Sequence, residues 1–360
     1  MPNNRRPAHK GGSSVYVTGK KGTRDAARIE LSRMPLRTFI CLIFLLAPVY
    51  SAEPGSLVQA QAGSVRQQVQ IPPAQTSQPI RVSSNLVQVP VSVTDEAGQA
   101  VKGLHLEDFV VEENGVPVTI AHIGEPGQTR LEMVMVFDVT GSVFARFDFE
   151  QHAATTFLEA IFQQGDAISI LCIGPKPRLV LKRTVSLAEA LDGLGQLKPT
   201  GASTAFYDSV IEAARTLAGP PDPDTRRVQI VLSDGEDNYS DAELSDAVRR
   251  VQQADCIFYS INPGGSSIRL NKVSQRGQEG MEELAKQTGG AAFLAEKTDD
   301  LTVIYGRIAA ELKAQYLLSY YAPESKTKDD FRHISVRLPK HPDLRVRARL
   351  GYYASSSSIR

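Results

Sequence analysis

The pattern of apolar and polar positions changes twice along the chain. From residue 80 to 127, apolar residues tend to alternate with polar ones, and valines occupy every second position between 87 and 93. This period of two is typical of a half-buried β-strand. Pro90 lies in that strand and cannot donate to a ladder, so we expect an edge or bulged strand. The apolar residues before and after Asn114-Gly115 predict a hairpin, with a return strand through Val116, Val118 and Ile120.

The middle of the chain, residues 128–315, has a different pattern. Short apolar runs of strand length alternate with stretches in which apolar residues recur every three or four positions. The pattern predicts strands at 133–137, 167–173, 178–182, 228–232, 256–261 and 291–294. It predicts helices at 149–161, 206–217, 244–251, 281–288 and 301–312. Alternating strands and helices indicate an α/β fold with a doubly wound, mainly parallel sheet.

The last segment, residues 316–360, returns to a β pattern. Strands are expected at 316–321, 333–338 and 344–350. This segment and the β segment at 80–127 are each too short to bury a core alone. We therefore expect the two to pair as one small β-sandwich, with the α/β domain inserted between its halves.

The N-terminal region reads as a targeting and tether segment rather than as part of the fold. Residues 1–52 contain a basic stretch, an apolar run at 38–49 and the small residues Ser51 and Ala52, which is the layout of a signal peptide. Met34 is a natural start for such a signal. Residues 53–79 are rich in Gln, Ser and Pro and indicate a disordered linker. We expect export to the periplasm, cell surface or medium; the alternative is an uncleaved N-terminal anchor as the only membrane attachment.

Charge and cysteine content narrow the function further. The formal net charge of the whole chain is zero. Residues 1–37 carry nine basic and two acidic residues, a net charge of +7, so the rest of the chain has a net charge of −7. This acidic body gives no electrostatic case for nucleic-acid binding. Cys41 lies in the signal segment, whereas Cys172 and Cys256 fall in separate apolar strands. We expect both of the latter to be buried free thiols.

Three loops at the ends of predicted strands carry the candidate chemistry. Asp138, Thr140 and Ser142 follow one buried strand, Thr204 lies in the loop before a helix, and Asp234 follows another buried strand. In open α/β sheets, ligands bind beyond the carboxyl ends of the strands. Hard oxygen donors of this kind suit Mg²⁺ or Ca²⁺. The alternative is ordinary turn and helix-cap chemistry, which uses the same residue types.

These motifs resemble the von Willebrand factor type A domain with its metal-ion-dependent adhesion site. The family pattern is Asp-x-Ser-x-Ser, then a Thr in a second loop and an Asp in a third, matched here by Asp138, Thr140, Ser142, Thr204 and Asp234. Thr140 stands where the family usually has Ser, and it keeps the hydroxyl. The flanks, with Glu112-Glu-Asn-Gly115 and the terminal Val346-Arg-Ala-Arg-Leu-Gly-Tyr-Tyr353, resemble the exported bacterial "VWFA-related acidobacterial" proteins.

The resemblance implies a binding mechanism and a sheet order that separates Cys172 from Cys256. Thr140 and Ser142 would bind the ion directly, and Asp138 and Asp234 would balance its charge. Thr204 would enter or leave the coordination shell. The ion would be Mg²⁺, with Mn²⁺ or Ca²⁺ as alternatives. A protein partner would complete the coordination with an Asp or Glu carboxylate, and the protein would not be an enzyme.

Two other classes of function stay open. A phosphohydrolase of the haloacid dehalogenase type also begins with an Asp after a buried strand. It needs a second Asp two residues later as acid/base, where this chain has Thr140. A metal-free structural scaffold is the other alternative. Glu236, Asp237 and Asp241 form an acidic rim after Asp234, which we interpret as a solvated loop rather than as a second cation site.

Overall fold

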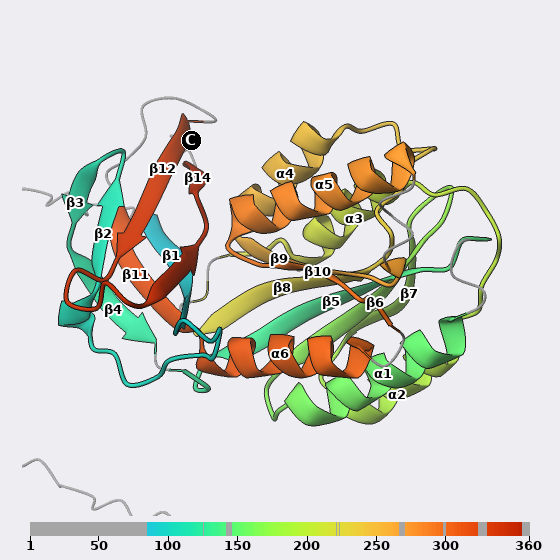
Figure 1. Ribbon diagram of the computed structural model, residues 1–360, viewed down its shortest axis with the longest axis horizontal. Helices are drawn as coiled ribbons and strands as arrows, with labels where there is room; N and C mark the ends of the chain where they lie inside the picture. Colours follow the sequence, from blue (N-terminus) through green and yellow to red (C-terminus); the bar gives the residue numbers. More distant parts are fainter. Residues whose placement is uncertain are drawn as a thin grey trace, which may run out of the picture. The chain divides into compact units, whose positions relative to one another are not determined.

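The computed structural model describes residues 85–124, 126–141, 146–220, 222, 224–265, 271–297, 300–322 and 330–354 (Figure 1). The expected signal segment and linker at 1–79 lie outside these residues. Within the described ranges, no helix combines the length and the apolar character needed to cross a membrane.

A six-stranded sheet forms the centre of the α/β layer. Its strands lie in the order β10 (Ala292–Leu294), β9 (Cys256–Asn262), β8 (Thr225–Leu232), β5 (Arg130–Asp138), β6 (Ala167–Ile173) and β7 (Arg178–Thr184). Neighbouring strands are parallel except for the antiparallel pair β6 and β7. The expected doubly wound, mainly parallel sheet is therefore confirmed. Cys172 in β6 and Cys256 in β9 are separated by two strands, and both are buried free thiols as expected.

Helices cover both faces of this sheet, which explains why β5 is apolar without a break from Met133 to Phe137. One face carries α1 (Phe147–Ile161), α2 (Leu187–Gly195) and α6 (Asp300–Ala314), and the other carries α3 (Phe206–Leu217), α4 (Leu244–Gln253) and α5 (Lys272–Thr288) (Figure 1). Met135 of β5 packs with the first set, whereas Val134 and Val136 pack with the second. The sequence pattern missed α2 and placed the start of α5 nine residues late.

Two four-stranded antiparallel sheets combine strands from both flanks of the α/β layer. The first has the order β13 (Arg345–Ala348), β1 (Asn85–Thr94), β11 (Tyr316–Ala322) and β4 (Ile120–Gly124). The second has the order β14 (Gly351–Ala354), β12 (Asp330–Arg337), β2 (Val110–Glu113) and β3 (Val116–Val118). A shared apolar core lies between them. This confirms the expected β-sandwich; the exact segment limits at 127/128 and 315/316 stay predictions.

Three details of the β segments differ from the expectation. Strand β1 is not an edge strand, because β11 and β13 pair with it on its two sides. Two residues of its polar face, Gln88 and Ser92, are also buried. Gln88 donates a hydrogen bond to the carbonyl of Asp222 at 2.9 Å. Asn114 and Gly115 have the positive φ angles of a tight hairpin turn. The return strand then divides into β3 and β4, which belong to different sheets. The expected strand at 344–350 corresponds to β13 alone, and β14 follows it as a separate strand that the sequence pattern did not predict.

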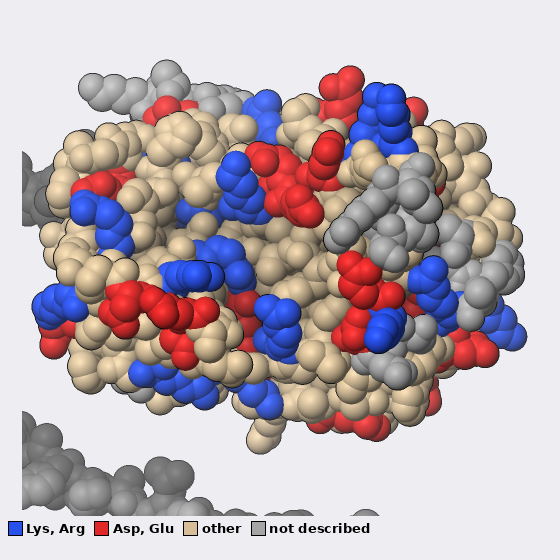
Figure 2. All heavy atoms as spheres, in the orientation of Figure 1, with Lys and Arg blue, Asp and Glu red and all other residues tan. Residues whose placement is uncertain are grey.

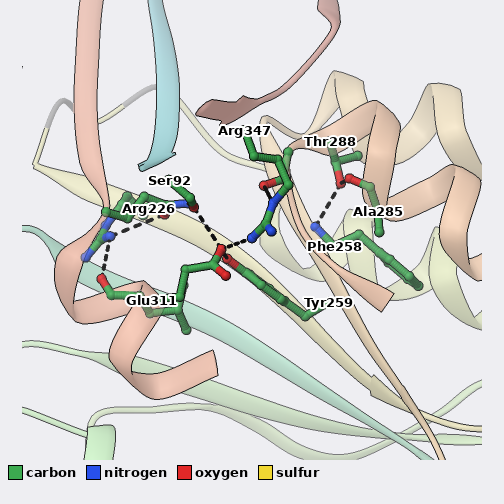
Figure 3. A network of polar contacts seen from close by, with 11 residues as sticks. Ser92, Arg226, Phe258, Tyr259, Ala285, Thr288, Glu311 and Arg347 are labelled. Atoms are coloured by element: carbon green, nitrogen blue, oxygen red, sulfur yellow. Dashed lines mark hydrogen bonds and ion pairs between the residues drawn. The ribbon is translucent and has the colours of Figure 1, made fainter. Parts of the chain in front are cut away.

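A polar network centred on Glu311 joins the sandwich to the α/β layer (Figure 3). The Glu311 carboxylate on α6 accepts hydrogen bonds from Ser92 of β1 at 2.8 Å and from Tyr259 of β9 at 2.5 Å. It also forms an ion pair with Arg347 of β13. Arg226 of β8 donates to the carbonyl of Leu312 at 2.7 Å. Partners from four strands therefore converge on the C-terminal part of α6.

Candidate metal centre

Asp138 is the last residue of β5 and is almost completely buried, with 1% of its surface exposed. Its Oδ1 accepts hydrogen bonds from the backbone N–H of Thr140 at 2.9 Å and from the Thr140 hydroxyl at 2.6 Å. Its Oδ2 accepts from the Ser233 hydroxyl at 2.8 Å. These donors fix the carboxylate at the carboxyl end of the sheet, where the sequence placed the site.

Thr204 and Thr140 bring two hydroxyl oxygens together. Thr204 Oγ1 donates to Thr140 Oγ1 over 3.2 Å, and both residues are buried. Adjacent ligands of an octahedral ion bound at about 2.1 Å lie about 3 Å apart. Because Thr140 directs its own proton to Asp138, its oxygen keeps a lone pair for another contact. The two hydroxyls therefore have the spacing of neighbouring ligands of a small divalent cation.

The loop that carries Thr204 is held from two sides. The backbone N–H of Thr204 donates to the Asn238 side chain at 3.0 Å, and the Thr204 carbonyl accepts from the backbone N–H groups of Asn238 and Tyr239, each at 3.1 Å. Thr200, in the same loop, donates to the Val139 carbonyl through its N–H at 2.6 Å. These bonds tie the Thr204 loop to the loops after β5 and β8.

Asp234 lies two residues after the end of β8 and is partly buried. Its neighbour Ser233 binds Asp138, which places the two loops side by side. The Asp234 carboxylate accepts from the backbone N–H of Glu236 at 3.1 Å. Ser142, the remaining predicted ligand, lies outside the described residues. Of the five predicted site residues, the structure joins Asp138, Thr140 and Thr204 by hydrogen bonds and places Asp234 next to Ser233.

The electrostatics of this edge favour a cation. Burial raises the pKa of Asp138, the charge of Glu236 adds to this effect, and the hydrogen bonds from Thr140 and Ser233 oppose it. Burial also raises the pKa of Glu150 to about 8, and the charges of Asp138 and Asp234 contribute to that increase. A cation bound here would lower both pKa values. Among the described residues, no three His, Cys, Asp or Glu side chains form a metal cluster, so binding would depend on hydroxyl ligands.

The acidic rim has a structural role in part. Asp237 Oδ2 accepts from the backbone N–H of Tyr207 at 3.1 Å, in the first turn of α3, and from the Ser240 hydroxyl at 2.5 Å. Glu236 accepts from the Ser274 hydroxyl of α5. These contacts use the carboxylates to fix the loop after β8. Glu236 and Asp237 are partly buried, so this part of the rim is less solvated than expected, whereas Asp241 is exposed.

Sequence reasoning missed Ser233, Asn238 and Glu150. Ser233 lies between Leu232, the last residue of a predicted strand, and Asp234, a predicted site residue. Its hydroxyl at this position was the signal that could have indicated a role in the site. Asn238 follows the acidic rim and resembles a turn residue. Glu150 lies three residues after the buried Phe147 and four before the buried Ala154, so helical spacing places it on the buried face of α1.

The strand order, the helices on both faces and the oxygen-bearing loops at one sheet edge define a von Willebrand factor type A-like domain. The β-sandwich built from the flanking segments is an addition to that domain.

Comparisons with known proteins find similarity to this chain only among solved structures. No protein-family model matches the chain, and no curated protein sequence matches it. Among solved structures, a von Willebrand factor type A protein from Catenulispora acidiphila is similar over 78% of this chain and 76% of its own, with 12% identity and a TM-score of 0.43.

Two further solved structures are similar to a shorter part of the chain. The BatB protein from Bacteroides thetaiotaomicron is covered over 99% of its length and matches 51% of this chain, with 14% identity and a TM-score of 0.41. Proximal thread matrix protein 1 from the mussel byssus, in a form described as having a zinc-occupied MIDAS motif, is 15% identical over 57% of this chain and 50% of its own, with a TM-score of 0.44. These similarities are weak.

Proposed function

We propose that this chain is an exported, metal-dependent binding protein that recognises a protein partner through the site after β5. Thr140, Ser142 and Thr204 would supply hydroxyl ligands to Mg²⁺, with Mn²⁺ or Ca²⁺ as alternative ions. Asp138 and Asp234 would balance its charge. The observation that supports this best is the chain of hydrogen bonds from Thr204 to Thr140 to Asp138, because it holds two hydroxyl oxygens 3.2 Å apart beside a buried carboxylate.

The donor set favours binding over catalysis. When bound, a divalent ion held mainly by neutral hydroxyls stays electrophilic and attracts a carboxylate from outside. Thr140 occupies the position that a phosphohydrolase would give to an acid/base carboxylate, and its hydroxyl donates to Asp138. Asp138 therefore has the role of an acceptor that orients Thr140, which supports an Asp or Glu of the partner as the group that completes the coordination.

The surroundings of the site suit a protein partner. Tyr239 follows Asn238, whose amide oxygen holds the Thr204 loop, and 58% of the Tyr239 surface is exposed. Exposed aromatic residues are enriched at protein interfaces. Basic and acidic side chains are interspersed on the face shown in Figure 2, in contrast to the basic stripes that bind nucleic acids.

The test is isothermal titration of Mg²⁺, Mn²⁺ and Ca²⁺ into the full chain and its variants. We expect saturable binding to the wild type that is lost in Asp138→Ala and Thr204→Val. The matched control is Thr216→Val, because Thr216 makes only a local bond to the Glu212 carbonyl of α3. Turnover of a phosphate ester that depends on Asp138 would instead support the phosphohydrolase. Absence of both binding and turnover would indicate the scaffold.

A further inference from the structure

Glu150 interrupts an otherwise apolar face of α1. The buried positions of this helix are Phe147, Glu150, Ala153, Ala154, Phe157, Leu158 and Ile161. Helical spacing places these positions on the face that packs on the sheet. Glu150 is the only charged residue among them, with 1% of its surface exposed. It lies in the first turn of α1, the end of the helix that follows the Asp138 loop.

The environment of Glu150 differs from that of the other buried glutamate, Glu113. The Glu113 carboxylate in the sandwich accepts from Tyr320 at 2.6 Å and Tyr352 at 2.8 Å, and it pairs with Arg332 at 2.9 Å. Glu150 Oε1 is buried and has no hydrogen-bond partner among the described residues. A buried carboxylate without partners is costly in free energy. The sandwich supplies neutralising partners to its glutamate, whereas α1 leaves one oxygen of its glutamate without a donor.

The place of Glu150 in the fold puts it at the edge of the sheet that carries the candidate metal centre. Strand β5 ends at Asp138, and Glu150 is buried in the first turn of α1, the helix that follows and packs against β5. In agreement with this placement, the charges of Asp138 and Asp234 raise the pKa of Glu150, after the larger effect of burial, and Arg146 opposes them. The buried hydroxyl of Tyr305 in α6 has no hydrogen-bond partner within the described ranges and supplies no donor to Glu150.

We infer that Glu150 is an anionic member of the cation site, whose charge increases affinity for a divalent ion from behind Asp138 and Asp234. This inference rests on the proposed function. The unpaired oxygen has the position and charge that a bound cation, or a water molecule of its shell, would complement. Glu150 would therefore lower the stability of the metal-free protein and increase the affinity of the site for a divalent cation.

The experiment measures both effects on the full chain with Mn²⁺ as the probe. Glu150→Gln keeps the shape and removes the charge. We expect it to bind Mn²⁺ about tenfold more weakly than the wild type, because an opposite charge is lost from a low-dielectric site. In EDTA, the same variant should melt several degrees higher, because the wild-type carboxyl must either stay ionised without a partner or take up a proton on folding. Glu150→Asp, which keeps the charge, should retain affinity within about threefold.

Glu113→Gln is the matched control, because it neutralises a buried glutamate far from the site that has its full set of partners. It should lower the melting temperature and leave Mn²⁺ affinity unchanged. If Asp138→Ala loses Mn²⁺ but Glu150→Gln binds like the wild type, the inference about Glu150 is wrong and the proposed function stands. A Glu150→Gln variant that melts below the wild type in EDTA also overturns it. If the wild type itself binds no Mn²⁺, the proposed function is wrong, and the inference about Glu150 is wrong with it.

Discussion

Gly235 and Gly277 are in direct backbone contact. A methyl group added at Gly277 would lie 2.6 Å from the carbonyl carbon of Gly235 and 2.7 Å from the carbonyl oxygen of Asp234. Gly235 also has a φ angle of +75°, a conformation that favours glycine. The loop that carries Asp234 therefore rests on α5, and the position of this candidate ligand depends on a helix that the sequence pattern predicted only in part.

Substitution of Gly277 should disturb the candidate site. In Gly277→Ala the new methyl group forces the backbone of residues 234–235 away from α5. We expect a loss of about 2 kcal/mol in unfolding free energy and a weaker affinity for Mn²⁺, measured by urea unfolding and calorimetry. The control is Gly306→Ala in α6, where the added methyl meets no atom within 4 Å. That change should stabilise the protein by about 0.5–1 kcal/mol.

Substitutions of Thr140 test the importance of its hydroxyl. Thr140→Ser keeps the oxygen that bonds to Asp138 and Thr204, so cation affinity should stay within about threefold of the wild type. Thr140→Val keeps the shape but removes the oxygen, and it leaves Asp138 Oδ1 without its hydroxyl donor. We expect calorimetry to detect no cation binding by this variant. Equal affinity of the valine and serine variants would show that the hydroxyl is not a ligand.

The stability of the metal-free protein should depend on pH through Glu150. The pKa of Glu150 rises from 4.5 in a solvated chain to about 8 in the fold. Between these values the folded state binds more protons than the unfolded state, so the unfolding free energy falls as pH rises. At about 1.4 kcal/mol per pKa unit, the full effect is on the order of 5 kcal/mol. Urea unfolding in EDTA should show Glu150→Gln gaining on the wild type from pH 5 to pH 8. A difference independent of pH would contradict this.

The carboxylate of Glu113 should be essential to the sandwich. Tyr320, Tyr352 and Arg332 all converge on it, and the Glu113 and Arg332 side chains are more than nine-tenths buried. Glu113→Gln removes the buried counterion of Arg332 and leaves the longer contact to the more exposed Asp330 at 3.4 Å, which should cost about 3 kcal/mol. Tyr352→Phe removes one donor and should cost about 1–1.5 kcal/mol. Guanidinium unfolding of the two variants measures both values, and a stability equal to the wild type would rule out this role.

The fold was predictable wherever the periodicity was strong. The apolar run that forms β6 gave the limits Ala167–Ile173 directly, because a strand buried on both faces has no polar break. The first half of α5 was not predicted, because its buried positions include Gly277 and Gly280, which carry no apolar signal. The burial of Gln88 and Ser92 was not predictable either, since their partners Asp222 and Glu311 are more than 130 residues away in sequence.

The candidate site could be predicted in its residue types and only partly in its construction. Spacing and resemblance indicated Asp138, Thr140 and Thr204, and the structure joins them by hydrogen bonds. The role of Ser233 depends on its hydrogen bond to Asp138, which lies 95 residues earlier in the sequence. No local pattern therefore marks Ser233 as the partner of Asp138. Glu150 carries a helical signal that indicates burial, but only the tertiary structure shows that its oxygen lacks a donor.

The interleaved sandwich sets an order of events during synthesis. Strand β1 leaves the ribosome more than 200 residues before its neighbours β11 and β13, which it needs on both sides. The intervening α/β layer can form first, because its strands pair among themselves. Until the last strands emerge, the valines of β1 stay without their sheet, which is a state prone to aggregation. A nascent chain that stops before β11 would therefore hold only the N-terminal half of the sandwich core, and the final strands complete a sheet that began with the first.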